Sequence, residues 1–345
     1  MMKKIAVIGH FDFKNNSMIG AVVKARSVYD ELINTYGLCA VGTVDIFDWR
    51  KRKFSVMKQL LKVFSQYKNI ALVISDTSKP LMTLFGMLKK FFNNNILYIV
   101  VGGDIADIIE ADPRKIDNLK IADNFFVETQ DCLDKMIALG FKSTFLLRNF
   151  KSIEPVDKKS LIKEFRSTFK FCTFSRVTEQ KGILDAINAI KKINDEAGKE
   201  ICVLDIYGQI EDEFRNKFEE YLNLCPSARY CGVVGANESV KTISDYYCLL
   251  FPTKYQSEGI PGTIVDGFAA GVPAIASNWC RCNQVVTDGF DGIVYEFGDF
   301  DDFVKKIKFA INNQDIINVL RENCLVTFEQ YRAGTAIIPL LKCIK

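Results

Sequence analysis

The chain has 345 residues, of which 48% are hydrophobic and 25% are charged, and its net charge at pH 7 is +3. This composition is ordinary for a globular protein, and the length suffices for two domains with separate cores. There is no run of about eighteen or more apolar residues, and the N-terminal apolar run is too short for a signal peptide. We therefore expect a cytosolic protein without a transmembrane helix, whose eleven cysteines are reduced thiols.

The first half of the chain alternates apolar strands with helical segments. We predict an amphipathic helix at 21–36 and strands at residues 5–8, 70–75, 96–101, 124–128 and 144–147. This alternation is typical of a parallel sheet with helices on both faces.

Polar residues follow three of these strands, at the ends where ligands of parallel sheets bind: His10, Asp104 and Asn149. His10, the only histidine in the chain, is a candidate ligand contact, but a structural role is at least as consistent with its position. The G-x-G-x-x-G fingerprint is absent after the first strand, which disfavours a dinucleotide site.

Residues 47–68 combine a basic cluster, Arg50 to Lys53, with apolar residues at helical spacing. These apolar residues are Phe54, Met57, Leu60, Leu61 and Phe64. Two interpretations are equally open: a helix that lies on an anionic membrane surface, and a core helix with a basic solvent-facing side. Residues 1–150 hold 21 Lys and Arg against 15 Asp and Glu, whereas the remainder holds 24 against 27. A nucleic acid is a less suitable partner, because the overall charge is small and no nucleic-acid motif is present.

A polar segment at 151–163 predicts a linker, and a second alternating unit follows it. We predict its strands from residue 169, at 201–207, 230–234 and 247–252, from 273, and at 292–296, with a last helical segment at 326–344. Arg176 stands at the end of the first of these strands, and Lys181 comes five residues later at the start of a helix. Two cations so placed can offset the charge of a diphosphate without a metal. The alternative is a pair of surface cations without a ligand.

The most informative stretch is S-E-G-I-P-G-T-I-V-D-G-F-A-A-G-V-P-A-I-A-S at residues 257–277. Pro261 fits the first position of a short apolar helix. The next amides, those of Gly262, Thr263 and Ile264, are then unpaired donors at the positive end of the helix dipole. Because Gly262 has no side chain, a phosphate can approach the backbone closely. The alternative is an ordinary capped helix of an α/β sheet.

Two acidic residues, Glu258 and Asp266, flank this anion site. Like charges repel at short range, so both carboxylates are better suited to accept hydrogen bonds from sugar and ribose hydroxyls than to face a phosphate. A structural metal is not expected, because Cys280-x-Cys282 has no partner pair at zinc-ligand spacing. The D-x-D at 299–301 is better explained by a helix N-cap.

These residues resemble the E-x7-E signature of retaining nucleotide-sugar glycosyltransferases of the large family four, which have the GT-B fold. The family pattern reads roughly E-G-F-P-x-x-x-x-E-A-x-A-x-G-x-P-V-I-A-S. It is matched at Glu258, Gly259, Pro261, Ala269, Gly271, Pro273, Ile275, Ala276 and Ser277. The chain departs from it at Asp266, where the family has Glu, and at Gly267, where it has Ala. Upstream, residues 169–182 resemble the family's strand followed by G-R-L-x-x-x-K-G.

The resemblance implies an α/β GT-B fold of two facing Rossmann-like domains with parallel sheets. The N-terminal acceptor-binding domain would span 1–150, the C-terminal nucleotide-sugar-binding domain 151–325, and a crossover helix at 326–345 would return to the first domain. Catalytic roles are implied for Arg176, Lys181 and Glu258. Donor contacts are implied at Gly262, Thr263, Ile264, Asp266, Gly208, Val233 and Gly20, and acceptor-side contacts at His10, Asp104 and Asn149. Beyond the nucleotide-sugar co-substrate, no cofactor and no metal are expected.

The expected function is retaining, metal-independent transfer of a hexosyl group from a nucleotide-diphospho-sugar to a saccharide acceptor. The acceptor would be a free or polyprenyl-linked saccharide in surface polysaccharide biosynthesis. The expected location is the cytoplasm, including the inner face of the plasma membrane if residues 47–68 bind lipid. Two alternatives stay open: a sugar-nucleotide 2-epimerase of the same fold, and a non-catalytic partner subunit. The second is suggested by Asp266 and by the lack of a histidine near Asp104.

Overall fold

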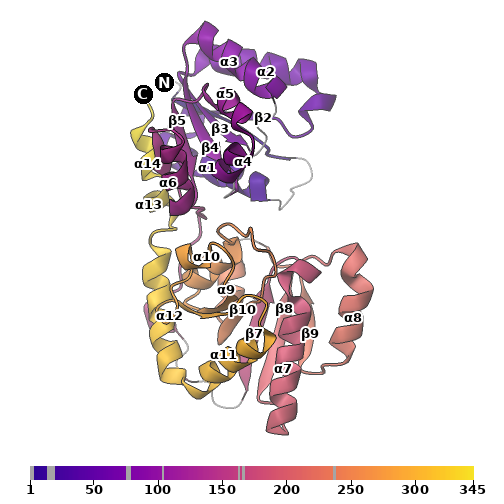
Figure 1. The fold of residues 1–345 in the computed structure, drawn as a ribbon. Helices are drawn as coiled ribbons and strands as arrows, with labels where there is room; N and C mark the ends of the chain where they lie inside the picture. Colours follow the sequence, from indigo (N-terminus) through magenta and orange to yellow (C-terminus); the bar gives the residue numbers. More distant parts are fainter. Residues whose placement is uncertain are drawn as a thin grey trace. The chain divides into compact units, whose positions relative to one another are not determined.

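The computed structural model describes residues 4–13, 20–74, 79–102, 105–161, 164, 168–235 and 238–345. The chain divides into two compact units, Met1–Ser152 together with Tyr331–Lys345, and Ile153–Gln330. Each unit contains a six-stranded parallel sheet with packed helices (Figure 1). The predicted alternation of strands and helices is therefore confirmed in both halves. Within the described ranges, no helix combines the length and the apolar character needed to cross a membrane.

The sheet of the first unit has the strand order β2-β1-β3-β4-β5-β6. The strands are β1 (Ile5–Gly9), β2 (Val41–Asp45), β3 (Asn69–Ile74), β4 (Asn95–Val100), β5 (Asn124–Val127) and β6 (Thr144–Leu146). Only β2 was missed by the sequence analysis, because Gly42 weakens its apolar pattern. A Cβ at Gly42 would lie 2.7 Å from the Tyr67 ring, so the close packing of that ring explains the glycine.

The helices of the first unit cover both faces of its sheet. They are α1 (Gly20–Tyr36), α2 (Lys53–Gln66), α3 (Lys79–Phe92), α4 (Ile105–Ala111), α5 (Ile116–Leu119) and α6 (Gln130–Ala138), with the 3₁₀ helices η1 (Leu38–Ala40), η2 (Trp49–Lys51) and η3 (Pro113–Lys115). The helices α2 to α6 pack on the face formed by alternate strand residues such as Ile70 and Leu72. The opposite face, which includes Ala71 and Val73, is covered by α1 and by the C-terminal residues.

The C-terminal residues are bonded to the starts of two central strands in the first unit. Asn69 Nδ2 donates to the carbonyl of Lys345 at 2.8 Å, and Asn95 Nδ2 donates to the carbonyl of Cys343 at 2.9 Å. The prediction of one helical segment at 326–344 is wrong, because α12 (Gln314–Phe328) ends before a turn and two short helices follow it. These are α13 (Ala333–Ala336) and α14 (Ile338–Lys342). Pro339 in the first turn of α14 lacks the N–H that a continuous helix would need.

The sheet of the second unit has the strand order β12-β11-β10-β7-β8-β9. The strands are β7 (Phe169–Phe174), β8 (Cys202–Tyr207), β9 (Ala228–Gly232), β10 (Cys248–Phe251), β11 (Ala274–Ser277) and β12 (Gly292–Tyr295). The remaining helices are α7 (Ile183–Ala197), α8 (Arg215–Asn223), α9 (Ser239–Ile243), α10 (Gly262–Ala269) and α11 (Phe300–Asn312), with η4 (Lys158–Ser160), η5 (Glu179–Lys181), η6 (Asp212–Phe214) and η7 (Cys282–Gln284). Asp299 caps α11, since its Oδ1 accepts the Asp302 N–H at 2.9 Å, which confirms the N-cap interpretation of the D-x-D.

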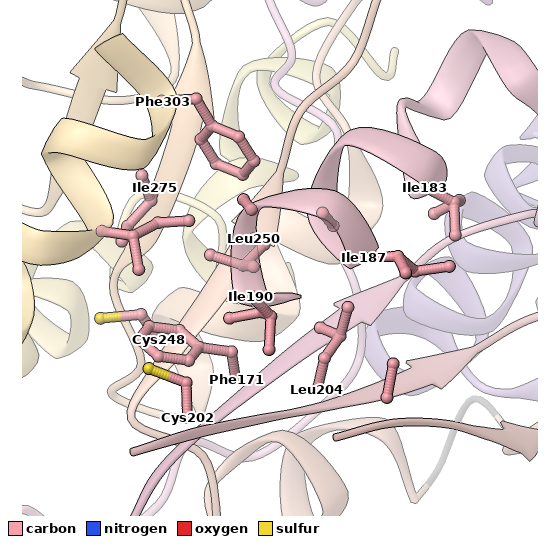
Figure 2. Packing of buried hydrophobic residues seen from close by; sticks show 14 of the residues in the cluster. Phe171, Ile183, Ile187, Ile190, Cys202, Leu204, Cys248, Leu250, Ile275 and Phe303 are labelled. Atoms are coloured by element: carbon pink, nitrogen blue, oxygen red, sulfur yellow. The ribbon is translucent and has the colours of Figure 1, made fainter. Parts of the chain in front are cut away.

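The core of the second unit forms where α7 meets the sheet. Figure 2 shows Ile183, Ile187 and Ile190 of α7 gathered with strand residues such as Phe171 and Leu204. These helical residues recur at the spacing that puts side chains on one face of a helix. The opposite sheet face is occupied by α10, whose Gly267 lies close to Leu249 of β10. Both layers hold the carboxyl ends of β7 and β10 in place.

Candidate active site

The second sheet has a topological switch point between β7 and β10. From β7 the chain continues to β8 and β9 on one side, whereas β10, β11 and β12 lie on the other. Open α/β sheets bind ligands at such a point, beyond the carboxyl ends of the strands, because the connecting loops diverge there. Two segments follow the two strands: residues 175–182 after β7, and residues 252–261 after β10. The sequence analysis placed Arg176, Lys181 and Glu258 in these two segments.

The structure brings Lys181 and Glu258 together. Lys181 Nζ lies 2.5 Å from Glu258 Oε2, and both side chains are 15% exposed. The ammonium also lies 5.5 Å from the centre of the Phe251 ring, and Thr253 Oγ1 donates to Glu258 Oε2 at 3.3 Å. Both contacts of the glutamate to the described residues therefore use Oε2. Its other oxygen, Oε1, is left to accept hydrogen bonds from a ligand.

A glycine makes this approach of the two segments feasible. Gly182 has φ of +66°, and a Cβ there would lie 1.8 Å from the carbonyl oxygen of Pro252. The neighbouring Lys254 N–H donates to the carbonyl of Gln180 at 2.8 Å. The turn that carries Lys181 is thus packed directly on the end of β10, which sets the position of the ammonium beside Glu258. Gly182 is the last residue of the motif at 169–182, and the sequence pattern gives no sign of this packing role.

Arg176 lies in the same segment as Lys181, two residues after the end of β7. Gly208 has φ of +136°, and a Cβ there would lie 1.8 Å from the carbonyl oxygen of Ser175. Gly208 thereby holds the backbone before Arg176, while its own carbonyl accepts from the Tyr230 hydroxyl at 2.8 Å. The Arg176 side chain is exposed and makes no ion pair with the part of the chain that the structure describes. Its charge is available to a ligand.

The start of α10 differs from the prediction. Pro261 is the N-cap, with ψ of 123°, and is not the first helical residue. Its carbonyl accepts the Ile264 N–H at 3.0 Å, so the prediction of an unpaired amide at Ile264 is wrong. The predicted contact of Ile264 with a nucleotide-sugar stays a prediction. The N-cap and the first helical position share the φ that proline imposes and differ in ψ, which the sequence does not specify.

Three donors remain at the start of α10. The amides of Gly262 and Thr263 have no backbone acceptor within the described residues. Thr263 Oγ1 is buried and has no hydrogen-bond partner in the same part of the chain. A buried hydroxyl without a partner is costly, and a bound anion would supply the missing acceptor. Together with the helix dipole, these donors make the end of α10 suited to a phosphate group.

Three other residues predicted to contact the nucleotide-sugar lie in separate elements of the structure. Asp266 is 2% exposed within α10. Val233 follows β9 and is 68% exposed. Gly20 is the first residue of α1, in the first compact unit. These assignments stay predictions, and the ribose contact of Asp266 requires a ligand to reach a buried carboxylate.

The acceptor-side candidates belong to the first unit. His10 directly follows β1, beside the switch point between β1 and β3, and its ring meets the Phe47 ring edge-on at 6.1 Å between centroids. Asn149 follows β6 and is partly buried. Asp104 lies outside the described residues. None of these three roles is tested by the contacts of the described side chains.

Residues 157–324 match the family model of glycosyl transferases group 1. A curated relative from Escherichia coli, a UDP-Gal:alpha-D-GlcNAc-diphosphoundecaprenol alpha-1,3-galactosyltransferase, is 25% identical over 169 residues, which cover 48% of this chain and 42% of the relative. An uncharacterized glycosyltransferase of Methanocaldococcus jannaschii is 26% identical over 251 residues, which cover 65% of this chain and 60% of the relative. This chain thus spans about half the length of the curated relatives it matches.

Solved structures of low sequence identity share the fold over nearly the whole chain. HepE of Anabaena, in complex with UDP and glucose, has a TM-score of 0.70 at 12% identity, covering 99% of both chains. A glycosyltransferase from Rickettsia africae has a TM-score of 0.75 at 12% identity, covering 99% of this chain and 97% of the other. The chain therefore has the two-domain α/β GT-B fold, and its residues 157–324 are similar to the glycosyl transferases group 1.

Proposed function

We propose that this protein is a retaining glycosyltransferase that moves a hexosyl group from a nucleotide-diphospho-sugar to a saccharide acceptor. The observation that carries the proposal is the Lys181–Glu258 pair at the switch point of the second sheet. The loop that holds Glu258 leads directly into Gly262 and Thr263, whose amides are unpaired among the described residues. The carboxyl edge of this sheet thus combines a cation, a carboxylate and the positive end of a helix.

The charges at this edge of the sheet suit a diphosphate attached to a sugar. An ammonium has three N–H donors, so Lys181 can keep its bond to Glu258 and also donate to a phosphate oxygen. Arg176 and the two α10 amides add positive charge for the second phosphate. Glu258 Oε1 would accept from hydroxyls of the donor sugar. This division of roles requires no metal, and we include metal independence in the proposal.

The reaction follows from where negative charge develops. As the bond between the anomeric carbon and the phosphate oxygen breaks, charge accumulates on the leaving diphosphate, and the cations and amides stabilise it. The acceptor hydroxyl oxygen bonds to the anomeric carbon on the same face, and its proton passes to the leaving phosphate oxygen. The configuration of the anomeric carbon is then retained. No histidine is required for this proton transfer.

We further propose a polyprenyl-linked saccharide as the acceptor, in surface polysaccharide biosynthesis. Support comes from the name of the E. coli relative, which acts on a diphosphoundecaprenol-linked sugar. His10 and Asn149, at strand ends of the first unit, are the acceptor-side candidates among the described residues.

A thermal-shift screen with UDP-, GDP-, dTDP- and CMP-sugars tests the donor, because a ligand that binds the native state raises its stability. We expect stabilisation by one of the first three and none by the CMP-sugar, which has a single phosphate. Stabilisation by none of the diphosphates would contradict the donor site.

Incubation with the donor and an acceptor, with EDTA present, then tests transfer. We expect the nucleoside diphosphate and a product with the anomeric configuration of the donor, read by proton NMR. Conversion of the donor to its sugar epimer without any acceptor would instead identify an epimerase, and inversion would refute retention.

A further inference from the structure

The helices α2 and α3 present an exposed surface of unusual composition. Phe54, Met57 and Leu61 of α2 are exposed, as are Met87 and Phe91 of α3. The exposed fraction reaches 94% for Phe54 and 81% for Phe91. Large apolar side chains grouped in this way commonly mark an interaction site. We call these five residues, with the exposed lysines named below, the α2–α3 surface.

The two helices direct this surface to one side of the first unit. Val56, Leu60 and Phe64 of α2 and Leu81, Phe85 and Leu88 of α3 are buried in the same core, on one face of the sheet. The rings of Phe64 and Phe85 stack at 6.3 Å between centroids, so the helices are neighbours (Figure 1). Because each helix buries one side against the same sheet face, its opposite side points away from that face. The exposed side chains of both helices therefore share one outer surface.

Positive charge surrounds the apolar residues. Residues 49–103 contain ten Lys and Arg and a single acidic residue, Asp76. Neither helix contains Asp or Glu. Lys53, Lys58, Lys62 and Lys90 are exposed and make no ion pair with the described residues. The surface of a folded protein usually carries positive and negative side chains side by side, whereas this stretch is almost free of carboxylates.

We propose that the α2–α3 surface docks onto an anionic phospholipid bilayer. The apolar side chains would enter the interface between headgroups and acyl chains, while the lysines around them contact lipid phosphates. Charge complementarity favours an anionic bilayer as the partner. Four lysines without carboxylate partners would instead repel a second copy of the same surface. The two interpretations of residues 47–68 then apply to opposite sides of the same helix. The helix α3 contributes two of the five exposed apolar side chains. The proposal goes beyond transferase activity and does not depend on it.

Vesicle flotation without nucleotide-sugar or acceptor tests the docking. We expect the full chain to bind vesicles that contain phosphatidylglycerol, to bind phosphatidylcholine vesicles weakly, and to be released by salt. Replacing Lys58, Lys62 and Lys90 with Gln should weaken binding by about a hundredfold, at ~1 kcal/mol for each charge. The control replaces Lys199, Lys241 and Lys305 with Gln, since these exposed lysines of the second unit change the net charge equally. We expect the control to bind like the unmodified protein.

A separate variant tests the apolar residues of the α2–α3 surface. Phe54→Ser with Phe91→Ser should weaken vesicle binding by at least about tenfold, whereas Leu224→Ser with Val326→Ser, at exposed sites of the second unit, should not. Equal losses in surface and control variants would overturn the proposal, because binding would then reflect net charge or general hydrophobicity. Absence of any preference for anionic vesicles would overturn it as well. So would a dimer in sedimentation that the Phe54→Ser, Phe91→Ser variant dissociates, which would identify a second copy as the occupant.

Discussion

Lys181 and Glu258 are 77 residues apart in the sequence, yet Nζ of the lysine lies 2.5 Å from Oε2 of the glutamate. The turn at Gly182 and the end of β10 create this proximity, because no side chain separates Gly182 from Pro252. The ion pair keeps the ammonium at the carboxyl edge of the sheet before any ligand arrives. A group positioned in advance loses little entropy when it stabilises a leaving diphosphate.

Lys181→Ala should reduce the transfer rate by about a hundredfold or more, because charge on the leaving diphosphate would lose a positioned cation. The loss should lie mainly in kcat, since this charge is greatest in the transition state. Steady-state kinetics of nucleoside diphosphate release checks it, with the exposed Lys199→Ala as the matched control. Near-normal turnover of a folded Lys181→Ala protein would rule out the assigned role.

Gly182→Ala and Gly198→Ala form a matched pair, because the two glycines have almost the same φ, +66° and +64°. At Gly198 a Cβ meets nothing within 4 Å, so alanine should cost only the left-handed strain of about 1 kcal/mol. At Gly182 the Cβ would collide with the Pro252 carbonyl, and we expect a loss of about 3 kcal/mol or more. Urea unfolding measures both. Equal losses would show that the turn moves freely away from β10.

Thr263→Val removes a hydroxyl that is buried and unpaired within the described residues, and it keeps the shape of the side chain. The free energy of unfolding without ligand should stay unchanged or increase, because an unsatisfied polar group is lost. Affinity for the nucleoside diphosphate should fall by about tenfold or more, the value of a hydrogen bond to a charged group. Titration calorimetry tests this, and Thr263→Ser, which keeps the hydroxyl, should bind nearly normally. Unaltered affinity of the valine variant would exclude a contact between the hydroxyl and the phosphate.

Burial raises the pKa of Asp291 above its usual value, although hydrogen bonds from Thr327 and Thr287 act in the opposite direction. A carboxyl whose pKa is raised on folding contributes most below its unfolded pKa, and that contribution is lost as the pH rises through the folded pKa. The stability of the unmodified protein relative to Asp291→Asn should therefore decrease from acidic to neutral pH. Urea unfolding of both proteins across this range checks the sign. If the stability of the unmodified protein relative to Asp291→Asn increased with pH, the raised pKa of Asp291 would be contradicted.

Much of the fold could be predicted from sequence, because the strands of parallel sheets are buried on both faces and read as continuous apolar runs. The run from Ile70 and the run from Ile96 are of this kind, and both proved to be central strands. The short β2 was missed because Gly42 interrupts its pattern for a reason that lies in Tyr67. The predicted start of α10 was one residue too early, because ψ of Pro261 depends on the loop before it.

The candidate site divides in the same way. The sequence by itself determined which chemical groups stand at the strand ends, namely Arg176, Lys181 and Glu258, because these positions follow from chain order. Only the tertiary structure decided that Lys181 contacts Glu258 and that the Ile264 amide is already paired. It also decided that Phe64 is buried while Phe54, on the same helix, is exposed. Helical spacing groups side chains on a helix, but only packing against the sheet determines which side of the helix faces the core.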